Sequence, residues 1–162
     1  MSADSPPLDA GARDDAELQE LYQEVILDHN RRPRNYRALE GGCRAEGYNP
    51  LCGDRLTVFL RVENGVIADA SFQGSGCAIS KASASLMTES VKGRTIAEAQ
   101  TLFERFQQMI TAASDATVES GMGKLAVLAG VRQFPVRVKC ASLAWHTLRA
   151  AVDARADVVS TE

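Results

Sequence analysis

At residues 55–74 the chain reads RLTVFLRVENGVIADASFQG. Apolar and polar residues alternate on both sides of Asn64-Gly65, and an Asn-Gly pair between two alternating runs is the strongest short-range signal for a β-hairpin. The alternation predicts a single buried face, formed by Leu56, Val58, Leu60 and Val62 before the turn and by Val66, Ala68, Ala70 and Phe72 after it. We therefore expect two antiparallel strands joined by a two-residue turn.

Helical patterns lie on both sides of this hairpin. Apolar residues recur at helical spacing over residues 15–32 and from a capping box at Thr95 and Glu98 onward. The segment AISKASASLMTESVKG, from Ala78, is expected to form a helix of small residues closed by Gly93. A short strand is expected around residues 43–48, and a short alternating segment, VRVK, leads into a last helix. This order predicts an α+β fold with a small antiparallel β-sheet of about three strands and helices packed on one face.

The composition indicates one domain in a reducing compartment. The chain has 162 residues, of which 45% are hydrophobic, and a net charge of −3, which argues against a nucleic-acid-binding protein. The acidic N-terminus does not resemble a signal or transit peptide, and no run is apolar enough to span a membrane. We expect a cytoplasmic protein with a disordered segment at 1–13, one domain at 14–154 and a C-terminal tail at 155–162.

Three potential metal ligands converge at the open end of the hairpin. If the register of a two-residue turn continues along both strands, Cys52 lies opposite Cys77 and Asp54 lies opposite Ser75. Cys52 and Asp54 are two residues apart, so in an extended segment their side chains point to the same side. A reducing compartment favours metal binding or thiol chemistry over a disulfide framework.

Two cysteines are expected at the starts of helices. Cys77 follows Gly76, where unpaired backbone N–H groups favour a thiolate. Cys140 stands at the start of the last helix and is a candidate fourth ligand, although local spacing does not show that it reaches the other three. Free cysteines are also often ordinary buried residues, and that alternative stays open. Cys52 follows the Asn49-Pro50 break and precedes the strand, so it is the cysteine best placed to move.

Other chemically active residues fit ordinary structural roles. Cys43 lies outside the constellation, and His29 falls on the apolar face of the first helix. His146 is six residues after Cys140, which places it about 240° around a helix, so the two cannot share one ion. A basic cluster is either a solvated surface or a docking patch for an acidic partner; it consists of Arg31, Arg32, Arg34 and Arg37.

The sequence resembles the U-type iron-sulfur cluster assembly proteins, the IscU/SufU family. The matching segments appear in family order between Leu21 and Val152 and read LYQEVILDHNRRPRN, NPLCGD, GSGCAISKASASLMTE, VKGRT and VRVKCASLAWHTL. The resemblance implies a small antiparallel sheet covered by helices. It also implies a metal site at Cys52, Asp54, Cys77 and Cys140.

Two features resemble the SufU type within that family. Lys139 stands where IscU proteins have a histidine, and the interval of 63 residues between Cys77 and Cys140 is longer than in IscU. The SufU resemblance implies a tightly held zinc ion and a role in receiving sulfur from a SufS-type cysteine desulfurase, with a Suf scaffold complex downstream. Because Cys52 leaves a loop while Cys77 and Cys140 are expected at helix starts, we expect Cys52 to be the residue that accepts the persulfide sulfur. The segment FPVRVK replaces the proline-rich motif that dedicated chaperones bind in IscU.

Two alternative functions remain. The same four residues would serve an iron-sulfur cluster assembly scaffold that binds a transient cluster in place of zinc. A non-catalytic interaction domain with a structural zinc is the other alternative, and it predicts that substituting the cysteines unfolds the chain.

Overall fold

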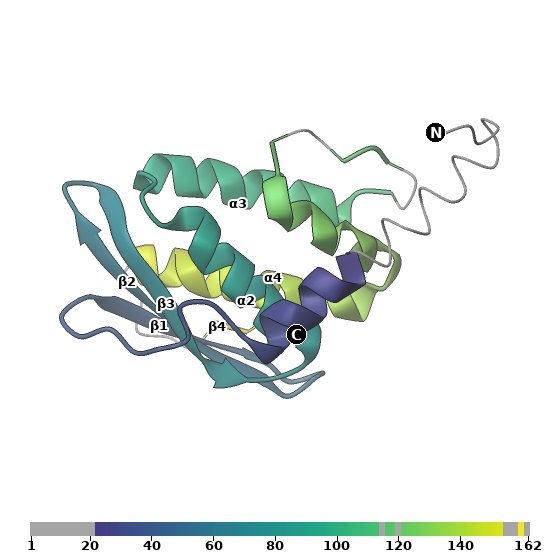
Figure 1. The fold of residues 1–162 in the computed structure, drawn as a ribbon, viewed down its shortest axis with the longest axis horizontal. Helices are drawn as coiled ribbons and strands as arrows, with labels where there is room; N and C mark the ends of the chain where they lie inside the picture. Colours follow the sequence, from purple (N-terminus) through teal and green to yellow (C-terminus); the bar gives the residue numbers. More distant parts are fainter. Residues whose placement is uncertain (1–21, 114–115, 119–120, 154–158, 161–162) are drawn as a thin grey trace, which may run out of the picture.

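The structure, a computed structural model, describes residues 22–113, 116–118, 121–153 and 159–160. A mixed sheet forms one side of the molecule, and the helices cover one of its faces (Figure 1). A helix runs through residues 22–31. The later elements follow in the order β1 (Cys43–Asn49), β2 (Asp54–Glu63), β3 (Val66–Ser75), α2 (Ala78–Val91), α3 (Ile96–Thr111), the 3-10 helix η1 (Gly123–Gln133), α4 (Pro135–Val152) and β4 (Val159–Ser160).

The β2–β3 hairpin confirms the prediction from the Asn-Gly pair. Asn64 and Gly65 have φ angles of 53° and 75°, and Glu63 pairs with Val66. Positive φ at both central residues is the conformation of a type I′ turn, whose twist matches that of the flanking strands. The turn therefore sets the pairing at the closed end of the hairpin.

A β-bulge changes this register one step farther along. Val62 pairs with Ile67, but Arg61 pairs with Asp69, so Ala68 is the extra residue. Ala68 is exposed and Ile67 takes the buried position, contrary to the predicted alternation. A bulge adds a residue to one strand, so every later pair is displaced by one.

The predicted pairs at the open end are consequently wrong. Ser75 pairs with Arg55, and Asp54 pairs with Asn49 of β1. Cys52 lies in the turn between β1 and β2 and does not face Cys77 across a ladder.

The sheet has the strand order β3-β2-β1-β4. The expected strand near residues 43–48 is confirmed as β1, which pairs antiparallel with β2. β4 adds a short parallel pairing to β1, within the segment expected as a tail. The domain boundaries stay predictions, and the segment 1–13 lies outside the described residues.

Local capping explains where α2 and α3 begin. The side chain of Cys77 accepts a hydrogen bond from the N–H of Ser80 at the start of α2. The predicted capping box of α3 is confirmed, because Thr95 Oγ1 accepts from the N–H of Glu98 and Glu98 Oε1 accepts from the N–H of Thr95. These bonds satisfy N–H groups that have no partner inside the helix.

The last helix begins earlier than the sequence pattern indicated. Pro135 occupies its first turn, and the VRVK segment is helical rather than extended. Four alternating residues are too few to distinguish a strand from a helix, whereas proline is favoured in the first helical turn. Cys140 is therefore the sixth residue of α4 and not a residue at its start.

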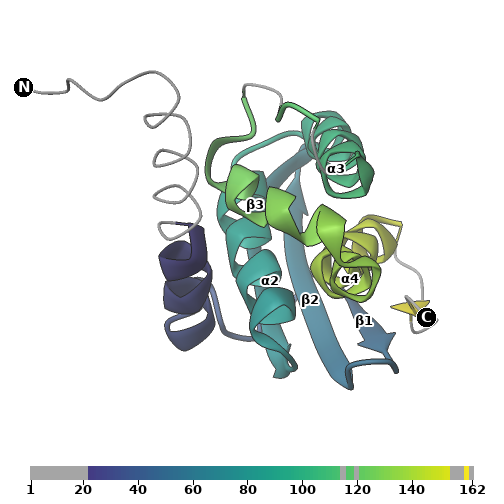
Figure 2. The same cartoon turned by 90° about the vertical axis from the view of Figure 1, so that its right-hand side faces the viewer.

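The helices form two layers over the sheet. α4 packs across β1 and β2, α2 packs on β3, and α3 packs against α4 and η1 (Figure 2). Trp145 of α4 stacks on Phe106 of α3 with ring centroids 4.7 Å apart. None of the helices in the described part of the chain is long and apolar enough to cross a membrane.

Candidate metal centre

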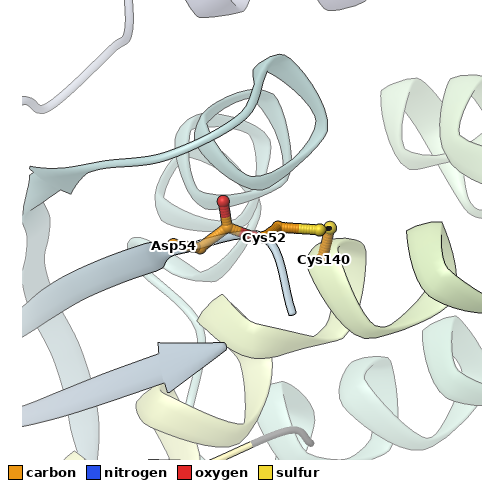
Figure 3. A group of neighbouring side chains, drawn as sticks. All are labelled: Cys52, Asp54 and Cys140. Atoms are coloured by element: carbon orange, nitrogen blue, oxygen red, sulfur yellow. Dashed lines mark hydrogen bonds between the residues drawn. The ribbon is translucent and has the colours of Figure 1, made fainter. Parts of the chain in front are cut away.

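Three segments meet at the open end of the hairpin. The turn at residues 50–53 carries Cys52, β2 begins with Asp54, and α4 passes beside both with Cys140 (Figure 3). The ligand atoms of these three residues all lie within 4.8 Å of one another. The structure thus brings together three of the four residues predicted to bind metal.

The sulfur atoms of Cys52 and Cys140 lie 3.1 Å apart. Both residues are free cysteines, and a disulfide would need a separation of about 2.05 Å. Cys140 is buried, whereas Cys52 is partly exposed. The pair therefore joins a sulfur held inside the fold to one near the solvent.

Asp54 is fully buried and hydrogen-bonded in the centre of the group. Its Oδ1 accepts from the N–H of Cys77 at 2.8 Å, and its Oδ2 accepts from Asn49 Nδ2 at 3.4 Å. Gly76 allows this approach, since a Cβ there would lie 2.6 Å from Asp54 Oδ1. A side chain at position 76 would displace the carboxylate, which gives this glycine a function in the site.

Cys77 stands next to the three clustered residues. Its sulfur lies 3.9 Å from Asp54 Oδ2 and accepts from the N–H of Ser80 at 3.4 Å. The prediction that Cys77 precedes a helix is confirmed. It is therefore the one cysteine of the site that receives a hydrogen bond from a helix start.

Cys140 has a different environment from the one its expected position implied. Burial raises the pKa of its thiol, and the contact with Cys52 and the negative charge of Cys77 raise it further. A residue one and a half turns into a helix has no unpaired N–H groups around it to offset burial. In the metal-free protein Cys140 is therefore held as a neutral thiol.

Arg137 is a site residue that the sequence analysis missed. It is exposed, and the negative charge of Cys77 is the main cause that raises the pKa of its guanidinium. It lies three positions before Cys140, so both lie on the same side of α4. A helix that starts at Pro135 places Arg137 and Cys140 on one side, but the sequence pattern of VRVK favoured an extended segment.

Exposed apolar side chains lie next to site residues in the sequence, Leu51 beside Cys52 and Val136 beside Arg137. Leu51, Phe134 and Val136 are exposed large hydrophobic residues. A cavity of about 450 Å³ is lined by residues that include Tyr22, Ile26, Ile79, Phe134 and Arg137. This cavity thus combines apolar side chains with the cation of Arg137, the residue that also interacts with the cysteines of the site.

The remaining candidates lie elsewhere. Cys43 begins β1 opposite Leu60. His29 is buried and its Nδ1 lies 2.7 Å from Ser85 Oγ, which fits the expected packing role. His146 meets the ring of Phe103 edge-on.

The basic cluster is partly engaged in ion pairs. Arg34 bonds to Asp28 at 2.6 Å and Arg37 bonds to Asp69 at 2.9 Å. Arg31 and Arg32 are exposed. The assignment of the cluster as a solvated surface or a docking patch stays a prediction.

The donor set suits a zinc ion. Zinc binds thiolates and carboxylates in a tetrahedron, whose edges are about 3.8 Å long for bonds of about 2.3 Å. The separations of 3.1 Å between Cys52 and Cys140 and of 3.9 Å between Cys77 and Asp54 bracket that edge. Cys52, Asp54 and Cys140 are thus close enough to share an ion and Cys77 lies beside Asp54, while the ion itself stays a prediction.

Comparisons with known proteins agree on one family. Residues 21–154 match the family model described as NifU-like N terminal domain. The chain is 38% identical over 138 residues to the zinc-dependent sulfurtransferase SufU of Bacillus subtilis, covering 85% of this chain and 92% of that protein. It is 36% identical over 137 residues to the iron-sulfur cluster assembly scaffold protein IscU of Streptococcus pyogenes, covering 85% and 86%.

A solved structure supports the same relationship. The crystal structure of a putative SUF-system scaffold protein from Fervidobacterium islandicum superposes with a TM-score of 0.73 at 31% identity, covering 80% of this chain and 94% of that one.

Proposed function

The chain belongs to the NifU-like N-terminal domain family, with SufU and IscU proteins among its relatives, and on this premise we propose that it is a zinc-dependent sulfur-transfer protein of iron-sulfur cluster biogenesis. In this proposal it accepts persulfide sulfur from a SufS-type cysteine desulfurase. The contact between the partly exposed Cys52 and the buried Cys140, beside a buried carboxylate, is the observation that supports it best.

Cys52, Asp54, Cys77 and Cys140 are the residues that would hold the ion. Zinc bound there would keep its cysteine ligands deprotonated and therefore nucleophilic. Asp54 and Cys140 are buried, and Cys77 is anchored by its bonds to Asp54 and Ser80. Cys52 lies in a four-residue turn and is the ligand with the least restraint on its backbone.

Cys52 is the sulfur acceptor in this scheme. Its thiolate attacks the terminal sulfur of a persulfide on the desulfurase, so a bond forms between Cys52 Sγ and that sulfur. The sulfur-sulfur bond of the donor persulfide breaks, and the donor cysteine leaves as a thiolate. The exposed guanidinium of Arg137 attracts the anionic sulfur to the opening of the site.

The first test is the metal content of the purified protein. We expect one zinc per monomer, because three thiolates and a carboxylate favour zinc in a closed site. Stoichiometric iron without zinc after gentle purification would contradict the proposal.

The second test locates the transferred sulfur. After incubation with a desulfurase and cysteine, mass spectrometry of trapped peptides should find the added sulfur on Cys52. A Cys52→Ala variant should carry none, and Cys43→Ala, outside the cluster, should behave as the wild type. Added sulfur found only on Cys77 or Cys140 would overturn the assignment.

A scaffold function is the second candidate, because relatives of similar identity are named as IscU scaffolds. Such a protein would assemble a cluster on the same residues. Protein purified without oxygen would then be coloured and would release iron and sulfide on acidification. A colourless protein that contains zinc supports the sulfur-transfer proposal.

A further inference from the structure

Asn49 is a buried polar residue at the metal centre that the ligand set does not include. It is the last residue of β1, has no exposed surface, and pairs with Asp54 across the ladder. Its amide makes three contacts: Nδ2 lies 3.4 Å from Asp54 Oδ2 and 3.5 Å from Cys140 Sγ, and Oδ1 accepts from the N–H of Leu51 at 3.2 Å.

The orientation of this amide follows from its neighbours. The N–H of Leu51 needs an acceptor, which only the carbonyl oxygen of the side chain supplies. A carboxylate and a sulfur need donors, and the NH₂ group faces both. The reversed orientation would place Oδ1 against the oxygen of Asp54 and leave Leu51 facing another donor.

We propose that Asn49 is a positioning residue that joins the turn carrying Cys52 to the two buried ligands, Asp54 and Cys140. This inference rests on the proposed metal site. One end of the amide restrains the turn one residue before Cys52, and the other end orients the carboxylate and the sulfur.

The chemistry of an amide suits both tasks. Three thiolates and a carboxylate carry more negative charge than one divalent ion cancels, and a neutral donor reduces the excess without adding a competing cation. Aspartate at this position would keep an acceptor for Leu51 but lose the donors. Alanine would lose both, so the two substitutions separate the two tasks.

The experiment compares Asn49→Ala and Asn49→Asp with wild type by two measurements. Zinc affinity is measured by competition with a chromophoric chelator, and the alkylation rate of Cys52 is measured by mass spectrometry on zinc-free protein. Thr147→Ala is the matched control, because it removes a buried hydroxyl from α4 two turns beyond Cys140.

Both Asn49 variants should bind zinc about 10–100-fold more weakly than wild type, as expected for loss of a hydrogen bond to metal ligands. Asn49→Ala should also speed alkylation of Cys52, whereas Asn49→Asp should leave that rate near the wild-type value. Thr147→Ala should change neither measurement. If Asn49→Ala does not fold, weaker zinc binding with unchanged alkylation in Asn49→Asp still supports the proposal.

Wild-type affinity in both variants would overturn the inference, as would an equal loss of affinity in Thr147→Ala. Failure of the wild-type protein to bind zinc would instead contradict the proposed function. In that case the alkylation rates still decide whether Asn49 restrains the turn.

Discussion

The two ends of the β2–β3 hairpin are held in different ways. At the closed end, backbone groups bond to backbone groups: the N–H of Ile96 donates to the carbonyl of Gly65, the N–H of Ile67 to that of Arg94, and the N–H of Gly93 to that of Ile67. At the open end, the contacts involve the side chains of Asn49, Asp54, Cys52, Cys77 and Cys140, and Asp54 also accepts from the backbone N–H of Cys77.

This difference separates stability from function. Backbone bonds at the closed end depend on chain conformation and tolerate many side chains. The open end depends on particular side chains drawn from segments as far apart as Asn49 and Cys140. Substitutions at the closed end should therefore change the free energy of unfolding alone, whereas those at the open end should change metal binding and sulfur transfer.

Asp54→Ala should have the largest effect. It leaves the N–H of Cys77 and the amide of Asn49 without their buried acceptor, which costs about 2–3 kcal/mol of unfolding free energy in the metal-free protein. Chemical denaturation measures this value, and sulfur-transfer assays should show a further loss of activity. Cys43→Ala is the control.

A folded, zinc-containing Asp54→Ala protein with normal sulfur transfer would show that the carboxylate does not belong to the working site. A variant that fails to fold even with zinc would favour a structural metal.

Gly65→Ala tests the closed end. The residue has φ of +75° with open space around it, so the cost is backbone strain of about 1–2 kcal/mol. Zinc affinity should equal that of the wild type. Gly130→Ala is a matched control, because Gly130 also has open space but no positive φ. Reduced zinc affinity in Gly65→Ala would contradict the separation of the two ends.

Arg137→Ala should slow sulfur transfer several-fold and leave the melting temperature unchanged, because the residue is exposed and acts through its charge. The transfer rate should also become less dependent on salt. Arg149→Ala removes an exposed arginine farther along α4 and should leave the rate intact. Equal rates in the wild type and Arg137→Ala would remove the arginine from the proposed scheme.

The smallest effect concerns acid titration at the closed end. Hydrogen bonds from Thr95 lower the pKa of Glu98 below 4.5. A carboxyl with a lowered pKa in the folded state stabilises the fold above its unfolded pKa and loses this contribution as pH falls through the folded value. In metal-free protein, the difference in unfolding free energy between wild type and Glu98→Gln should therefore shrink as the pH is lowered through the folded pKa of Glu98. A difference that is independent of pH would refute the linkage.

Features governed by neighbouring residues were predictable. The Asn64-Gly65 turn, the capping box at Thr95 and the helix start after Cys77 depend on contacts within four residues. The candidate ligand types were also visible in the sequence, since Cys52 and Asp54 lie two residues apart. The resemblance to known sequences supplied Cys140, which local spacing left open.

Tertiary packing decided the remaining features of the site. The bulge at Ala68 displaced the pairing of β2 with β3 by one residue toward the open end. Asp54 and Cys77 are joined by a hydrogen bond from the backbone N–H of Cys77 to the Asp54 carboxylate, not by pairing within the ladder. The packing of α4 on β1 brought Cys140 to Asn49, 91 residues earlier in the chain.

The sequence by itself determined the hairpin turn, the helix caps and the side chains available as candidate ligands, because short-range sterics and hydrogen bonds act between residues close in the chain. Only the tertiary structure decided that Cys140 is buried with a raised thiol pKa, that the charge of Arg137 acts on the cysteines and that Asn49 contacts both Asp54 and Cys140. Burial and electrostatic interaction depend on distance in space, and here that distance was set by how α4 packs on the sheet.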